Sequence, residues 1–201
     1  RISGFGGNDT LTGSAFADVI TGGTGADVMN GGAGADQFVF AQGDSTSVAV
    51  NLGNGTAGTL DTGDTYTFTG GADVVTGGFD ITGTSGDRIF LNSLPNLPGL
   101  AKMGTTPTNG LAAEGQYFLT RGSYASGVFT VNTTGGADTL VVYDGDATIG
   151  TTSQTALVVQ GLNPTQLLTS GNVIYAAPPD VTDRKSTRLN SSHVKRSRMP
   201  S

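Results

Sequence analysis

The 201-residue chain contains 33 Gly and neither Cys nor Trp. Without Cys it can form no disulfide bridges and no thiolate metal sites, so this Gly-rich chain needs another means of stabilisation. Ten basic and 16 acidic side chains give a formal net charge of −6, which disfavours nucleic-acid binding. No run of apolar residues approaches the ~18 residues that a membrane-spanning helix requires.

A nine-residue repeat opens the chain. Its aspartates recur at intervals of nine residues, at Asp9, Asp18, Asp27 and Asp36. The pattern is Gly-Gly-x-Gly-x-Asp-x-apolar-x, in which turn-forming residues precede a short strand. The apolar position holds Leu11, Ile20, Met29 and Phe38, which we expect to face inward. Because so short a strand cannot bury its side chain alone, successive units should stack into a solenoid with two units per coil.

Stacking also brings the acidic turns together. The turn at Asp9 should lie on that at Asp27, and the turn at Asp18 on that at Asp36. Carboxylates and carbonyls crowded in this way repel one another without a cation, and flexible, hard oxygen ligands suit Ca²⁺ better than Mg²⁺. We therefore predict calcium between alternate turns, with a flexible linker that binds no metal and a metal-free solenoid as the alternatives. The predicted site residues are the four aspartates with Gly4, Gly6, Gly13, Gly22, Thr24, Gly25, Gly31, Ala33 and Gly34, and the carbonyl groups of Gly22, Thr24, Gly31 and Ala33 are among the expected ligands.

Residues Gly22–Phe40, GGTGADVMNGGAGADQFVF, resemble the calcium-binding nonapeptide of repeats-in-toxin, or haemolysin-type, proteins. The resemblance implies a parallel β-roll with calcium between its turns, in a protein exported by the type I pathway of Gram-negative bacteria. It covers residues 4–40. The first repeat departs from the pattern at Phe5, and the second departs at Ser14 and Phe16, which predicts a weak or empty site in the second repeat.

Beyond Phe40 the repeat gives way to a Thr/Gly-rich β pattern. The expected strands are Thr65–Thr69, Arg88–Leu91, Gln116–Thr120, Val128–Asn132, Thr139–Tyr143, Ala156–Gln160 and Val173–Tyr175. One short helix is expected, with Asn163 as N-cap, Pro164 at its first position, and Leu167 and Leu168 before Gly171. Because a stack of repeats exposes an apolar end, this region should cap it. The predicted fold class is all-β: a short parallel β-roll over residues 1–40, then a Thr/Gly-rich β cap over residues 41–177.

Three later segments extend the family resemblance. Ala72–Leu91 is similar to the stretch that follows the last calcium repeat in this family, and Gly136–Asp146 and Leu167–Ala176 are similar to the terminal region of type I secreted proteins, which carries the export signal. Family members often have an acidic residue where this chain has Asn172. We interpret Asp73 and Asp138 as parts of degenerate repeats or turns. Asp144 and Asp146 fit a hairpin turn better than a further calcium site.

The end of the chain has a different composition. Six of the ten basic residues lie between Asp183 and Ser201. The segment Asp183–His193, DRKSTRLNSSH, matches the in-frame translation of a widely used sequencing-library adapter, and RSRMPS at the end matches its far side. We therefore expect residues 178–201 to be disordered and 183–201 to be an adapter artefact, with the native sequence ending near Thr182. The remaining residues carry a net charge of −11.

No catalytic constellation is evident, so we do not expect this chain to be an enzyme. Its only His, His193, lies in the tail, and Ser123 lacks the second Gly of a nucleophile elbow. The predicted function is calcium binding that drives extracellular folding of the C-terminal region of a secreted or surface-bound Gram-negative protein, with the type I secretion apparatus as partner. One alternative is a self-associating surface-layer or adhesin module rigidified by calcium. Another is the tail of an exoenzyme whose catalytic domain precedes Arg1.

Overall fold

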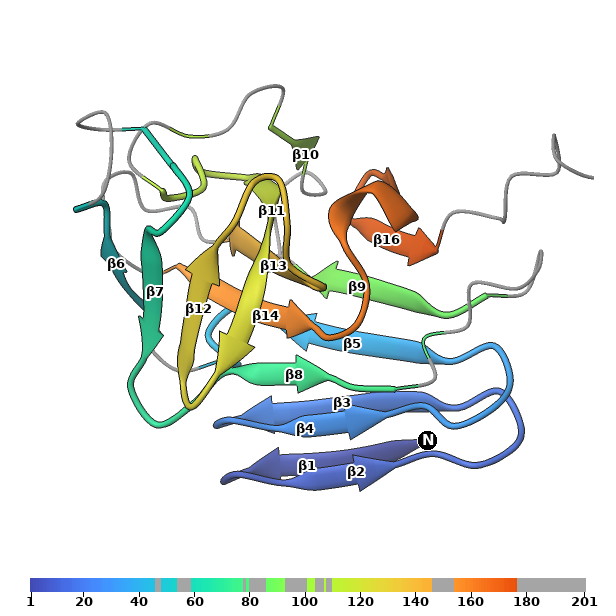
Figure 1. Ribbon diagram of the computed structural model, residues 1–201. Helices are drawn as coiled ribbons and strands as arrows, with labels where there is room; N and C mark the ends of the chain where they lie inside the picture. Colours follow the sequence, from blue (N-terminus) through green and yellow to red (C-terminus); the bar gives the residue numbers. More distant parts are fainter. Residues whose placement is uncertain are drawn as a thin grey trace, which may run out of the picture.

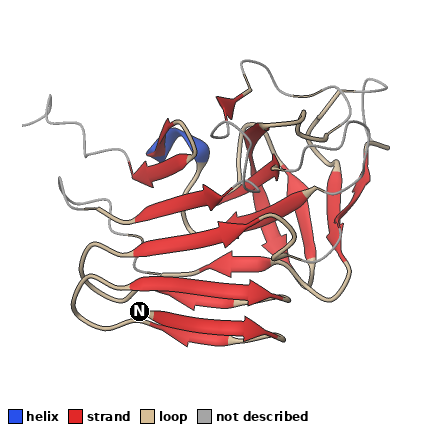
Figure 2. Ribbon diagram, turned by 180° about the vertical axis from the view of Figure 1, so that it is seen from behind, coloured by secondary structure: helices blue, strands red, loops and turns tan. Residues whose placement is uncertain are grey.

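The computed structural model describes residues 1–45, 48–53, 59–77, 79, 86–92, 101–103, 107, 110–145 and 154–176. Strands account for nearly all of its regular structure, as Figure 2 shows, and they form a six-stranded and a ten-stranded sheet. The all-β class expected from the sequence is therefore confirmed. No described helix has the length and hydropathy needed to cross a membrane. The predicted disordered tail and adapter segment lie outside the described residues.

The nonapeptides wind into a two-sided roll. One side is built from β1 (Ile2–Gly6), β3 (Val19–Thr24) and β5 (Gln37–Ala41), and the other from β2 (Thr10–Thr12) and β4 (Val28–Asn30). Neighbouring strands are parallel and 18 residues apart in register, so that Ile20 pairs with Phe38 and Leu11 with Met29. Each coil thus contains two nonapeptides, as predicted. Figure 1 shows β1 with β2 and β3 with β4 as successive layers.

Both sides of the roll continue beyond residue 40. On one side β9 (Arg88–Asn92) pairs in parallel with β5, and on the other β8 (Asp73–Val75) pairs in parallel with β4. These two strands form a third coil. The two sheets therefore cross the boundary that the sequence suggested between the roll and the region after it.

The remaining strands extend each sheet. The six-stranded sheet ends in the hairpin of β15 (Leu167–Ser170) and β16 (Val173–Ala176), which pairs with β9. In the ten-stranded sheet, β8 is followed in space by β14 (Thr155–Val159), β13 (Asp138–Asp144), β11 (Gln116–Ala125), β12 (Val128–Val131), β7 (Thr65–Phe68) and β6 (Val48–Asn51), while β10 (Ala101–Lys102) pairs with β11. Pairing is parallel up to β14 and antiparallel from there to β6.

All seven strands predicted beyond residue 40 are present, within a few residues at their ends, although β11 is longer than expected. Four strands were missed: β6, β8, β10 and β15. The predicted helix is a 3₁₀ turn, Pro164–Gln166, whose N-cap Asn163 forms a capping box with Gln166. Leu167 and Leu168, expected in that helix, instead lie in β15, because pairing with β16 provides backbone hydrogen bonds that a short helix cannot match.

A continuous apolar core joins the roll to the strands after it. Ile20, Met29 and Phe38 are fully buried, and Leu11 packs partly buried against the same cluster, as predicted. The cluster extends from these side chains to Leu157 and Ile174 of the C-terminal strands. A second cluster covers the other face of β13 and β14, so these strands are buried on both faces. The C-terminal strands thus cover the apolar core of the last coil.

Candidate metal centre

Aspartates of successive turns are joined by hydrogen bonds along the roll. The backbone N–H of Asp9 donates to Oδ1 of Asp27 at 2.8 Å, and that of Asp18 donates to Oδ1 of Asp36 at 2.8 Å. These are the two turn pairings that the nine-residue spacing predicted. Each bond uses only one oxygen of the accepting carboxylate.

The second carboxylate oxygen is left without a partner. Oδ2 of Asp9, Asp27 and Asp36 is buried and accepts no hydrogen bond, and the whole side chains of Asp27 and Asp36 are inaccessible to solvent. A buried, unpaired carboxylate oxygen is strongly unfavourable unless a cation compensates it. The same arrangement in three turns indicates a set of cation sites.

Glycines leave room for these oxygens. A Cβ added at Gly4 would lie 2.5 Å from Oδ2 of Asp9 and 2.6 Å from the carbonyl oxygen of Gly22, so both oxygens face the same point. Added Cβ atoms at Gly22 and Gly31 would overlap Oδ2 of Asp27 and Asp36. The first glycine of the repeat is therefore required by the position of the acidic oxygen.

The other predicted site residues contribute close backbone approach. Gly13 lies against the carbonyl group of Gly31, and Gly6 against the hydroxyl group of Thr24. Gly25 and Gly34, both with positive φ, leave no room for a side chain next to the preceding turn. The carbonyl oxygen of Thr24 accepts from the N–H of Gly7, and the N–H of Ala33 donates to Ser14. Carbonyl groups of these turns therefore lie in the same layers as the carboxylates.

Asp18 differs from the other three aspartates. Its Oδ2 accepts from both the backbone N–H and the hydroxyl group of Ser14, each at 2.8 Å. These bonds lower the pKa of Asp18. Because Ser14 stands where the repeat has its second Gly, the departure that the sequence showed in the second repeat supplies this carboxylate with protein donors.

Two further aspartates continue the arrangement in the third coil. The N–H of Asp27 donates to Oδ1 of Asp73 at 2.9 Å, and the N–H of Asp36 donates to Oδ1 of Asp87 at 2.8 Å. Oδ2 of Asp73 is buried without a partner. Sequence analysis did not assign these residues to a metal site because they are out of phase with the repeat. The signals present were Gly-Gly-Ala-Asp before β8 and Gly-Asp before β9.

The other acidic candidates have different surroundings. Both oxygens of Asp138, in β13 rather than in a turn, accept backbone N–H groups, from Tyr124 and Gly161. Asp144 accepts from the side chain of Gln154, whereas Asp146 lies outside the described residues. Asp138 therefore cross-links strands.

The chemistry of the donor set suits calcium. Among the described residues, no group of three or more His, Cys, Asp or Glu side chains has metal-site geometry. A cation between these turns would therefore take one or two carboxylates and complete its shell with backbone carbonyl groups. Calcium accepts six to eight oxygen ligands in flexible geometry, including carbonyl groups. The buried oxygens and the glycines beside them fit such an ion.

Burial also makes these carboxyl groups hard to ionise without a cation. It raises the pKa values of Asp27 and Asp36, and it raises the pKa of Asp73 from 3.8 to about 7, with the charges of Asp27 and Asp44 adding to the effect. Folding in the absence of metal thus favours the protonated forms.

We expect the calcium-free protein to lose stability as the pH rises. A carboxyl group whose folded pKa exceeds its unfolded value stabilises the fold fully below about pH 4, the unfolded pKa, and this contribution disappears as the pH passes the folded value, here about 7 for Asp73. Melting temperatures in chelator should therefore fall between pH 5 and pH 8. In saturating calcium the fall should vanish, because the metal binds the ionised form. A melting temperature in chelator that rises over this range would contradict the unpaired burial of these groups.

Phe5 adds strain to the first turn. It has φ 72° and is 82% exposed, and it pairs with Gly23, which has φ 100° in the next coil. Positive φ costs a non-Gly residue about 1–2 kcal/mol. Phe5→Gly should therefore raise the free energy of unfolding by about 1 kcal/mol, measured by urea denaturation in calcium. The matched control is Phe16→Gly, because Phe16 is 78% exposed without a positive φ; it should give no gain.

Comparison with known families agrees with this geometry. None of the curated proteins compared with the chain matches it. Residues 3–38 match, in four copies, the family described as RTX calcium-binding nonapeptide repeat. The match covers the two coils whose aspartates and glycines form the buried oxygen sites. Residues 3–38 of this chain are therefore four RTX calcium-binding nonapeptide repeats, folded as a β-roll.

Proposed function

We propose that calcium binding to these repeats drives the extracellular folding of the C-terminal region of a secreted Gram-negative protein. The observation that carries the proposal is the set of buried, unpartnered oxygens on Asp9, Asp27 and Asp36. The structure satisfies the backbone of these turns but leaves their charges uncompensated. Folding should then depend on a cation that the surroundings supply.

The cation concentration can act as the switch. At low cytosolic calcium the aspartates repel one another, and the many glycines make ordering of the chain entropically costly. An unfolded chain can thread the type I secretion apparatus, which we propose as the partner. Extracellular sites bind calcium with dissociation constants of roughly 10⁻⁴–10⁻³ M. At 100-fold excess over the dissociation constant, each independent site contributes about 2.7 kcal/mol.

The continuous core carries the signal to the rest of the chain. Because Ile20, Met29 and Phe38 belong to the same cluster as Leu157 and Ile174, closing the roll provides the surface on which the later strands pack. Strand pairing of β8 with β14 and of β9 with β16 gives the same direction of growth. We assign the chain no catalytic reaction.

Far-UV circular dichroism of the full chain, titrated with calcium and separately with magnesium, tests the proposal. The expected result is a coil-to-β transition near millimolar calcium that magnesium does not reproduce. Retention of the full β spectrum in chelator at pH 7.5, with no change in thermal stability on adding calcium, would overturn it.

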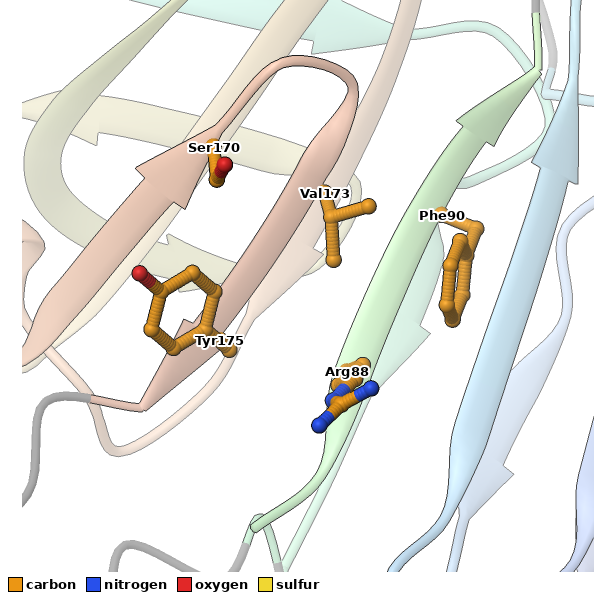
Figure 3. Close-up of a pocket in the computed structure, with 5 residues that line it drawn as sticks. All are labelled: Arg88, Phe90, Ser170, Val173 and Tyr175. Carbon is orange, nitrogen blue, oxygen red and sulfur yellow. The ribbon is translucent and has the colours of Figure 1, made fainter. Parts of the chain in front are cut away.

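A second candidate function, an adhesin or surface-layer module, is favoured by one surface feature. The outer face of the six-stranded sheet has an open pocket of about 320 Å³ lined by Arg88, Phe90, Ser170, Val173 and Tyr175, which Figure 3 shows on strands β9, β15 and β16. A guanidinium group beside two aromatic rings and a hydroxyl group can hold an acidic sugar through charge, stacking and hydrogen bonding. Calcium-dependent binding to an acidic-glycan array that Arg88→Ala removes would favour this function. A monomeric protein with no such binding would favour the folding module alone.

A further inference from the structure

One turn of the roll is assembled from two separate segments. The N–H of Gly25 donates to the carbonyl group of Asp44 at 2.9 Å, and Gly25 forms a parallel bridge with Ser45. Two residues further along the same turn, Asp27 donates to Asp73. Ser45 thus stacks on Gly25, and Asp73 stacks on Asp27, although these partners are 2 residues apart in one turn and 28 in the other.

Residues 46–71 are therefore inserted within a single turn. The insertion contains β6 and β7, which form the far end of the ten-stranded sheet. Its return end approaches the turn below closely, because a Cβ at Gly71 would lie 3.0 Å from that of Ala26. We call the residues on either side of the insertion, 44–45 and 72–73, the split turn.

The split turn contains an uncompensated carboxylate. Asp73 is 1% exposed, and its Oδ2 has no hydrogen-bond partner. The nearby hydroxyl group of Ser45 donates to the carbonyl group of Ala156 at 2.6 Å, so its proton is already used. Asp44, on the other segment, accepts from the N–H of Ala41 through Oδ2. The arrangement repeats that of Asp27 over the turn at Asp9, with the neighbouring oxygens supplied by a different part of the chain.

We propose that the split turn forms a further calcium site, outside the four repeats at residues 3–38, with Asp73 as its carboxylate ligand and Asp44 beside it. Backbone carbonyl groups of the turn at residues 22–27 complete its donor set. The proposal rests on the calcium binding described under Proposed function. Because its acidic residues come from both ends of the insertion, this ion holds the β6 and β7 segment closed onto the roll.

A buried tyrosine provides a local probe. The hydroxyl group of Tyr143 donates to the carbonyl group of Ala41 at 2.8 Å, and Ala41 is the residue whose N–H is bonded to Asp44. Terbium occupies calcium sites and emits when a nearby tyrosine is excited, and the chain has no Trp to compete. Tyr143→Phe keeps the ring and removes the excitation.

The experiment titrates the full chain with Tb³⁺, exciting tyrosine, and counts bound ions by equilibrium dialysis. We expect sensitised emission that Tyr143→Phe removes while the number of bound ions stays the same. Asp73→Asn retains an acceptor for the N–H of Asp27; it should weaken the emitting site at least tenfold and lower the number of bound ions by one. The matched variant Asp36→Asn, on the opposite side of the roll, should lose an ion and keep the emission.

The outcomes separate the two proposals. Emission that persists in Tyr143→Phe, or an ion count unchanged in Asp73→Asn, would overturn the split-turn site while leaving the repeats as calcium sites. A wild-type chain that binds no ion in dialysis would overturn the proposed function as well. The test with Tyr143→Phe does not depend on whether Asp73→Asn folds.

Discussion

Replacing Asp27 with Asn is expected to remove most of the calcium response while making the calcium-free protein more stable. Asn retains the oxygen that accepts the N–H of Asp9 at 2.8 Å, so the link between the turns survives. It replaces a buried, unpartnered carboxylate oxygen with a neutral group, and a buried unsatisfied charge costs about 1 kcal/mol or more. The calcium midpoint of the folding transition should rise at least tenfold, and the urea midpoint in chelator at pH 7.5 should increase.

Asp18→Asn is the matched control for this prediction. Asp18 has the same place in its repeat, but its Oδ2 is bonded to Ser14 and its pKa is lowered. Its replacement should therefore destabilise the calcium-free protein and shift the calcium midpoint less than Asp27→Asn does. Equal shifts in the two variants, or a calcium-free Asp27→Asn protein less stable than wild type, would show that the unpartnered oxygen is not a calcium ligand.

Replacing Gly31 with Ala should prevent the second coil from closing. The added Cβ would overlap Oδ2 of Asp36, a buried atom held between two turns, and would also approach its Cγ at 2.8 Å. Overpacking of this kind costs about 3 kcal/mol, and the displaced carboxylate would lose its position for calcium. The measurement is the free energy of unfolding in urea at saturating calcium, together with the calcium midpoint.

Gly43→Ala supplies the comparison for the Gly31 variant. Gly43 has φ 85°, and nothing lies within 4 Å of an added Cβ, so only backbone strain of about 1–2 kcal/mol is expected. The calcium midpoint of Gly43→Ala should move little. A Gly31→Ala variant with the stability and calcium midpoint of Gly43→Ala would mean that the glycine does not make room for the acidic oxygen.

Strand positions beyond the repeats followed from local patterns. Runs such as Thr139–Tyr143 combine β-branched and aromatic residues between Gly-rich turns, and they are strands in the structure. β8 and β15 were missed for different reasons. β8 has only three residues and is formed by pairing with β4 and β14, whereas β15 carries a helix start signal that pairing with β16 overrides.

The sequence by itself determined the roll and its metal. The nine-residue period fixes which side chains face inward and which aspartates stack, since each depends only on residues close in the chain. Only the tertiary structure placed Asp73 and Asp87 in the same columns, because the 26 residues between Ser45 and Ala72 break the period that a local pattern requires. Strand pairing restores the register across that insertion through hydrogen bonds between distant segments, which no nearest-neighbour signal encodes. It also decided which oxygens have partners: three repeat aspartates retain an unpartnered, buried oxygen, and Asp18 does not.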